Sequence, residues 1–273
     1  MARFSSLASR VAVAVPGIGA FVAVAFLNNN ILTAAFFAAV AFLAGMEALR
    51  LVDGESGFSV KLLAGILTGG ASLSVMFLNA AVSLVTVLIP GIVISAVWIM
   101  TARVKSARMR MGGITALSVL IALGIGLLAR LRLDYTSGWV IFIPLLSCWI
   151  GDSFAYFAGS AFGRHKLAPR VSPAKSWEGL GAGIVGSVAG SLAAGSAGAG
   201  YSLLSMGLVG FIAGLAGVLG DLLESAMKRD AGIKDSGSLL PGHGGILDRF
   251  DSLFLSAPVV WLMLVLLPKI GLH

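Results

Sequence analysis

Long apolar runs separated by short polar segments occupy most of the chain. Nine of these runs are near the length of about 20 residues that a helix needs to cross a bilayer. Within lipid such a run must be helical, because its backbone N–H and C=O groups find no water to bond. We therefore predict an all-α, polytopic integral membrane protein with about nine transmembrane helices. The predicted spans are roughly residues 11–27, 31–50, 59–78, 81–100, 112–133, 138–162, 178–199, 202–227 and 246–267.

The composition favours a membrane protein over a soluble one. Hydrophobic residues make up 58% of the chain and charged residues 11%, whereas soluble proteins carry about 25% charged residues. A soluble domain of this size could not bury so much apolar surface. The net charge of +7 fits basic loops facing an anionic leaflet, so we expect membrane lipids as partners and no nucleic acid. Cys148 is the single cysteine, which excludes an intrachain disulfide.

The basic residues favour one side of the membrane. With the N-terminus inside, all of the 19 lysines and arginines except Arg130, Arg132 and Lys269 fall in inside segments. The positive-inside rule then predicts that the N-terminus and the loops 163–178 and 228–246 are cytoplasmic, by default at a bacterial inner membrane. Most of the 12 acids follow residue 150, beside inside-facing loops. We therefore expect a transmembrane scaffold in residues 1–135 and a catalytic region in residues 136–273.

Small residues recur at every fourth position after residue 178, namely Gly179, Gly183, Ser187, Ser191 and Gly195. Such a ridge lets a second helix approach closely. Close packing within the protomer is the favoured interpretation, and a homodimer interface is the alternative.

The densest charge in the chain lies between residues 220 and 251. Asp221, Glu224, Ser225 and Lys228 have the spacing i, i+3, i+4 and i+7, which places them on one face of a helix. Carboxylates at membrane depth are costly unless they are paired or bind a metal. Further along, Asp248 and Asp251 begin the last span, where a helix N-terminus itself favours acids.

These residue types suit a site for metal-bound phosphate. Carboxylates without a histidine or cysteine cluster suit a hard cation such as Mg²⁺. Lysines, arginines and the backbone of Gly244 and Gly245 suit phosphate oxygens. This combination is typical of phosphoryl or nucleotidyl transfer, in which charge neutralisation dominates catalysis. A solvated charged loop and an ion-translocation site are the alternatives.

The same segment resembles the signature of the phosphatidate cytidylyltransferase family, also called CDP-diacylglycerol synthases. A second segment, residues 149–179, resembles the upstream motif of that family, with Ala174 where a lysine is common. The two motifs cover residues 149–251, and the first hundred residues carry no motif. The fixed positions of the signature are filled by Ser225, Lys228, Arg229, Lys234, Asp235, Gly237, Leu240, Pro241, His243, Gly244, Gly245, Asp248, Arg249 and Asp251.

The resemblance implies the reaction of CTP with phosphatidate to give CDP-diacylglycerol and pyrophosphate, with Mg²⁺ and an optional second cation as cofactors. It implies Asp221 and Asp248 as metal ligands and Lys228 as the group that neutralises phosphate charge. His243 would bond a phosphate or protonate the leaving pyrophosphate, and Asp251 would bind metal or orient Arg249. The implied substrate contacts are Lys175, Ser225, Arg229, Lys234, Gly244, Gly245 and Arg249.

Three further acids stand outside this set. Asp152 is expected as a metal ligand or as a supporting residue behind one. Glu178 is expected to cap the span that follows it, and Glu47 needs no functional role.

Two rival functions remain open. A CTP-dependent polyprenol or phytol kinase would move the γ-phosphoryl group to an alcohol, but such kinases lack the full signature. A cation-coupled transporter would also place acids in spans, usually with internal repeats, and we find no repeat.

Overall fold

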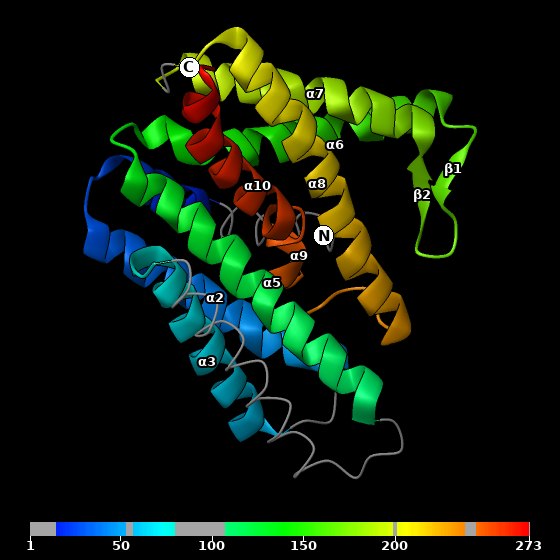
Figure 1. The fold of residues 1–273 in the computed structure, drawn as a ribbon. Coiled ribbons are helices and arrows are strands. Elements are labelled where there is room, and N and C mark those ends of the chain that lie inside the picture. The colour runs from blue at the N-terminus through cyan, green and yellow to red at the C-terminus, as the bar shows by residue number, and fades with distance from the viewer. Residues whose placement is uncertain (1–14, 53–56, 80–106, 199–200, 238–243, 273) are drawn as a thin grey trace, which may run out of the picture. The chain divides into compact units, whose positions relative to one another are not determined.

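The computed structural model describes residues 15–52, 57–79, 107–198, 201–237 and 244–272 (Figure 1). Helices dominate these residues, and a single hairpin of two strands accompanies them in the described part of the chain. In chain order the elements are helix Val15–Phe26, α2 (Asn30–Val52), α3 (Phe58–Phe77), α5 (Ala107–Asp134), η1 (Gly138–Ile141), α6 (Phe142–Phe162), β1 (Lys166–Ala168), β2 (Ser172–Ser176), α7 (Trp177–Ser196), α8 (Leu203–Asp230), α9 (Leu247–Phe250), α10 (Leu253–Leu266) and η2 (Leu267–Ile270).

The predicted fold class is confirmed. Within the described residues, seven helical segments are long and apolar enough to cross a membrane, and the protein is an integral membrane protein. Helix Val15–Phe26 covers nearly all of the predicted first span that the structure describes. The predicted span 81–100 lies outside the described residues, so the count of nine stays a prediction.

Two segments differ from the expected spans and loops. The predicted loop 163–178 contains the antiparallel hairpin β1–β2, which extends from the start of α7 in Figure 1. The last predicted span is not one helix, because the chain turns between α9 and α10. At this turn one carboxylate oxygen of Asp251 accepts hydrogen bonds from both the backbone N–H (2.6 Å) and the hydroxyl of Ser252. Such local side-chain bonds compete with the helical backbone pattern and explain the break.

The chain forms two compact units. The first unit comprises residues 1–129 and 230–250, and the second comprises residues 130–229 and 251–273. The division into a scaffold, residues 1–135, and a catalytic region, residues 136–273, is a division by role and stays a prediction.

The first unit is built on close contact between α2 and α3. Gly65 of α3 lies against the backbone of Phe42, and Gly45 of α2 lies against Thr68, so that any larger residue would have to displace its neighbour. Two clusters of buried side chains complete the packing with α5; they are Leu49, Ala64 and Ile114, and Ala71, Val75 and Ala122.

The second unit uses the ridge of small residues on α7. A Cβ at Gly179 or Gly183 would meet backbone carbonyl oxygens of α6, and a Cβ at Gly210 of α8 would meet Ser191. The Ser187 hydroxyl donates to the carbonyl of Ser147 on α6 at 2.8 Å. The close packing that the spacing predicted is therefore found inside the protomer, where α7 contacts both α6 and α8.

Candidate active site

An ion pair joins the two sequence motifs within the second unit. The Nζ of Lys175, on β2, lies 2.7 Å from Oδ2 of Asp221, on α8. The other carboxylate oxygen of Asp221 accepts a hydrogen bond from the Ser225 hydroxyl at 3.1 Å. Both side chains of the pair are about one quarter exposed, at 24% and 25%. Both side chains are therefore accessible from the surface of the second unit.

One turn further along α8, a second ion pair is almost buried. Lys228 donates to Oε2 of Glu224 at 2.9 Å, and the Glu224 side chain is only 2% exposed. A buried carboxylate is tolerated only when it is paired, so Glu224 fixes the position of the Lys228 ammonium group. Asp251 lies close enough to interact electrostatically with Lys228 and Asp221 and to hydrogen-bond with Glu224.

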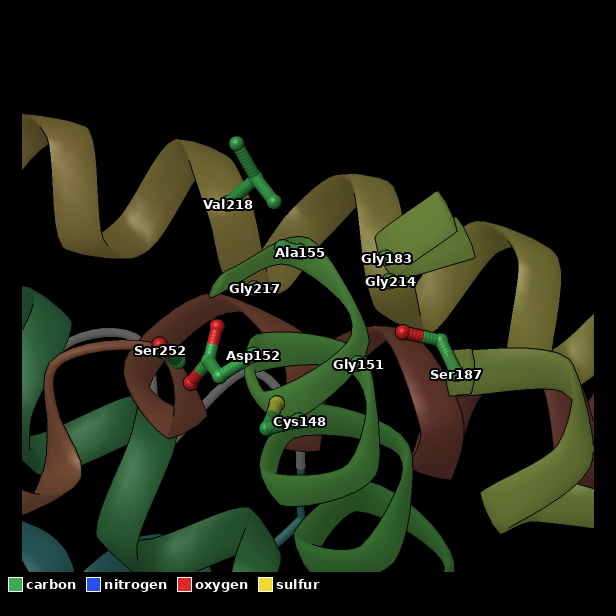
Figure 2. Close-up of a pocket in the computed structure, with 10 residues that line it drawn as sticks. All are labelled: Cys148, Gly151, Asp152, Ala155, Gly183, Ser187, Gly214, Gly217, Val218 and Ser252. Atoms are coloured by element: carbon green, nitrogen blue, oxygen red, sulfur yellow. The ribbon is translucent and has the colours of Figure 1, made fainter. Parts of the chain in front are cut away.

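Asp152, on α6, adds a third acid to this region. The ammonium group of Lys175 attracts its carboxylate, and the carboxylates of Asp221 and Asp251 repel it. Its exposed side chain lines a small pocket that Figure 2 shows between α6, α7, α8 and the start of α10. We call the six residues Asp152, Lys175, Asp221, Glu224, Lys228 and Asp251 the acid–lysine cluster.

Glycines and other small residues give the pocket its space. Gly151, Gly183, Gly214 and Gly217 all line it, from three different helices. Cys148, Ser187 and Ser252 contribute the other polar atoms, and Asp152 is its charged side chain (Figure 2). The pocket therefore offers a carboxylate within an otherwise uncharged wall.

In the first unit, two carboxylates hold the loop between α8 and α9. Asp248 accepts the N–H of Ser236 with both oxygens, at 3.2 and 3.0 Å, and the N–H of Gly245 at 2.9 Å. Glu47, on α2, accepts the N–H of Leu247 at 3.0 Å. Gly244 has φ +81°, a left-handed conformation that favours glycine, and a Cβ there would lie 3.0 Å from Asp248.

The hairpin is fastened to the start of α7 by Glu178. Its carboxylate accepts the N–H groups of Arg164 and His165 at 3.2 and 3.3 Å, and lies 2.6 Å from Nδ1 of His165. The cap of α7 is Ser176, whose hydroxyl accepts the N–H of Gly179 at 3.1 Å. The expectation that Glu178 caps this helix is therefore wrong, because serine takes the preferred N-cap position.

The model of the cytidylyltransferase family matches residues 8–267. The chain belongs to this family. Three relatives named phosphatidate cytidylyltransferase share 41–44% of their residues with this member over the matched segments. The protein of Mycobacterium leprae is 44% identical over 47% of this chain and 41% of its own length. The protein of Haemophilus influenzae is 41% identical over 52% of this chain and 53% of its own length. The protein of Synechocystis is 44% identical over 49% of this chain and 46% of its own length. The chain thus spans about half the length of the curated relatives it matches.

Five of the family residues named from the sequence come together in the second unit, where they lie near Asp152. These five are Lys175, Asp221, Ser225, Lys228 and Asp251. A sixth, Arg229, is exposed in the same unit and donates to the carbonyl of Val171 at 3.3 Å.

The remaining family residues belong to the first unit. Gly244 and Gly245 lie in the loop before α9, and Asp248 lies on α9 itself. Lys234 and Arg249 are exposed, and His243 lies outside the described residues. The expected metal ligands Asp221 and Asp248 thus belong to different units, and their shared role stays a prediction.

The donor types of the acid–lysine cluster would suit a magnesium ion that phosphate oxygens also bind. Among the residues that the structure describes, no group of three or more acids, histidines or cysteines is arranged to bind a metal by itself. Mg²⁺ usually takes only one or two carboxylates and fills its other positions with water and phosphate oxygens. Asp152, Asp221 and Asp251 interact electrostatically, and a cation would relieve their repulsion.

Two acids have buried contacts that the sequence does not indicate. Glu47 is 1% exposed, and it accepts a hydrogen bond from Leu247, which belongs to the signature segment. Its position inside an apolar span was the available signal, because such acids are costly and usually have a partner. Glu224 was placed on the correct helical face, but its burial beneath Lys228 was not foreseen.

Proposed function

We propose that this protein transfers the cytidylyl group of CTP to phosphatidate, giving CDP-diacylglycerol and pyrophosphate. The observation that carries the proposal is the ion pair between Lys175 and Asp221, which joins the two family motifs in one cluster of acids and lysines. Membership of the cytidylyltransferase family and relatives named phosphatidate cytidylyltransferase support it. No specific feature of the described residues favours the kinase or the transporter.

In this reaction a phosphate oxygen of phosphatidate attacks the α-phosphorus of CTP. The bond from the α-phosphorus to the bridging oxygen breaks, and pyrophosphate leaves with the bonding electron pair. Negative charge grows on the leaving group as this happens. Lys228, positioned by Glu224, and Lys175 are the cations that the cluster offers to this charge. Preorganised cations of this kind stabilise a transition state because they need no reorganisation during the reaction.

Asp221, together with Asp152 or Asp251, would hold Mg²⁺ in this account. The ion would neutralise phosphate charge and fix the orientation of the two substrates. Ser225 would keep the Asp221 carboxylate in place through its hydroxyl. These roles follow from the donor types in the cluster and from the family resemblance.

The location of the cluster suits one water-soluble and one lipid substrate. Asp221 and Lys228 lie in the last turns of the apolar helix α8, and Lys175 lies on the hairpin outside the spans. The end of a span is the level at which lipid headgroups meet water. The distribution of basic residues supports a cytoplasmic orientation of this end, where CTP would be available.

The test is an assay of the purified protein in detergent with CTP, phosphatidate and Mg²⁺. We expect CDP-diacylglycerol and pyrophosphate in equal amounts, and loss of both products in the variant Asp221→Asn. Arg130→Met is a matched control, because it removes an ion pair to Asp134 away from the cluster. Failure of the folded wild-type protein to form CDP-diacylglycerol would overturn the proposal.

A further inference from the structure

We propose that Glu47 is a positioning residue for Asp248, which the family resemblance implies as a catalytic residue, and this inference rests on the proposed function. Its carboxylate, supplied by the N-terminal scaffold, would hold the loop between α8 and α9 in the conformation that presents Asp248. The residue lies on α2, in the part of the chain without a family motif. It therefore gives the scaffold a direct role in catalysis.

The burial of Glu47 and its hydrogen bond to Leu247 both support this role. Glu47 is 1% exposed within an apolar span, where an acid is retained only if something compensates its desolvation. Its Oε2 accepts the N–H of Leu247 at 3.0 Å, across a sequence separation of 200 residues. Leu247 directly precedes Asp248 in the chain. The buried acid is thus bonded to the backbone of the signature segment.

The shape of the loop is fitted to the Glu47 carboxylate. A Cβ at Gly237 would overlap this carboxylate, and its three nearest atoms would all belong to Glu47. A Cβ at Gly245 would overlap the same carboxylate and the Ser236 hydroxyl. The two glycines therefore let the backbone pass directly over Glu47. This contact accounts for glycine at these two positions of the chain.

Glu47 and Asp248 together fix the backbone from two sides. Asp248 takes the N–H groups of Ser236 and Gly245, and Glu47 takes that of Leu247. If Glu47 is removed, the N–H of Leu247 loses its acceptor. The backbone position of Leu247, and with it that of the adjacent Asp248, is then less well fixed. A misplacement of about 1 Å at a catalytic group can lower a rate by about a hundredfold.

The first test compares three variants of Glu47 in the CDP-diacylglycerol assay. Glu47→Ala is expected to lower kcat by about 10- to 100-fold while KM for CTP changes by less than about threefold, since the cluster of the second unit is intact. Glu47→Gln keeps an acceptor oxygen for Leu247 and should stay within about threefold of wild-type kcat. If Glu47→Ala does not fold, Glu47→Asp withdraws the carboxylate by one methylene and should show the same loss.

Leu49→Ala is the matched control on the same helix. Leu49 is 2% exposed and packs with Ala64 and Ile114, so its loss lowers thermal stability without a change at the signature loop. We expect wild-type kcat from the folded fraction of this control. Glu47→Ala with wild-type kcat, or Leu49→Ala with the same loss of kcat, would overturn the inference.

A double-mutant cycle tests the contact itself. Gly237→Ala should lower kcat in the wild-type background and add little to Glu47→Ala, because the overlapping carboxylate is then gone. Equal effects in both backgrounds would contradict the contact. Hydrogen exchange of the segment 244–250 gives a readout that needs no activity, and it should become faster in Glu47→Ala but not in Leu49→Ala. If the wild-type protein makes no CDP-diacylglycerol, the proposed function fails, and the exchange result still decides on Glu47.

Discussion

The ion pair between Lys175 and Asp221 allows a structural role to be separated from a catalytic one. In the variant Lys175→Met, the pair is lost but the apolar length of the side chain remains. Both partners are about one quarter exposed, and Asp221 keeps its hydrogen bond from Ser225. A pair this exposed contributes about 1 kcal/mol or less to stability. We therefore expect the melting temperature in detergent to fall by a few degrees at most.

The expected loss of activity is much larger. If Lys175 meets the negative charge that develops on the phosphates, its removal should lower kcat by about 10²- to 10³-fold, or about 3–4 kcal/mol. The assay is formation of CDP-diacylglycerol under saturating substrates, with the amount of folded protein measured in parallel. Arg130→Met loses the comparable ion pair to Asp134, at 3.3 Å, and should keep wild-type kcat. Activity of Lys175→Met within about threefold of wild type would refute this reasoning.

Three further changes have defined expectations. Glu224→Gln breaks a buried pair and should lower the free energy of unfolding by about 3–5 kcal/mol, measured by thermal denaturation in detergent; an unchanged melting temperature would contradict the burial of the pair. Gly244→Ala and Gly232→Ala both place a side chain at positive φ, each costing about 1–2 kcal/mol. Only Gly244→Ala also crowds Asp248, so its turnover should fall well below that of Gly232→Ala. Equal turnover of the two variants would contradict a catalytic role for the loop that contacts Asp248. Chelation of divalent cations should abolish turnover, and added Mg²⁺ should restore it; turnover that persists in excess chelator would exclude the metal.

The membrane helices could be predicted from the sequence because their signal is local. A run of apolar residues must be helical in lipid wherever the rest of the chain lies, so the spans near 31–50, 59–78 and 202–227 were placed within a few residues. The break at Asp251 was missed, because it depends on one side chain bonding its own backbone neighbour. The hairpin was missed because its strands are short. Its attachment to α7 also depends on hydrogen bonds from Arg164 and His165 to Glu178, which lies 13 or more residues further along the chain.

The residue types of the site could be predicted from the sequence, but their contacts could not. The family motifs indicated the acids and lysines of α8 and β2. That Lys175 reaches Asp221 is a property of the folded second unit, since the two residues lie on separate elements. Glu47 shows the same limit more strongly. Its place in an apolar span signals that it needs a partner, but not that the partner is Leu247, 200 residues away.

The most direct test of cytidylyl transfer follows two labels of CTP in one reaction. The purified protein is incubated with phosphatidate, Mg²⁺ and CTP that carries one label at the α-phosphate and another at the γ-phosphate. The account predicts that the α-label enters lipid and the γ-label leaves in pyrophosphate. Entry of the γ-label into lipid without the α-label would contradict it and indicate a kinase.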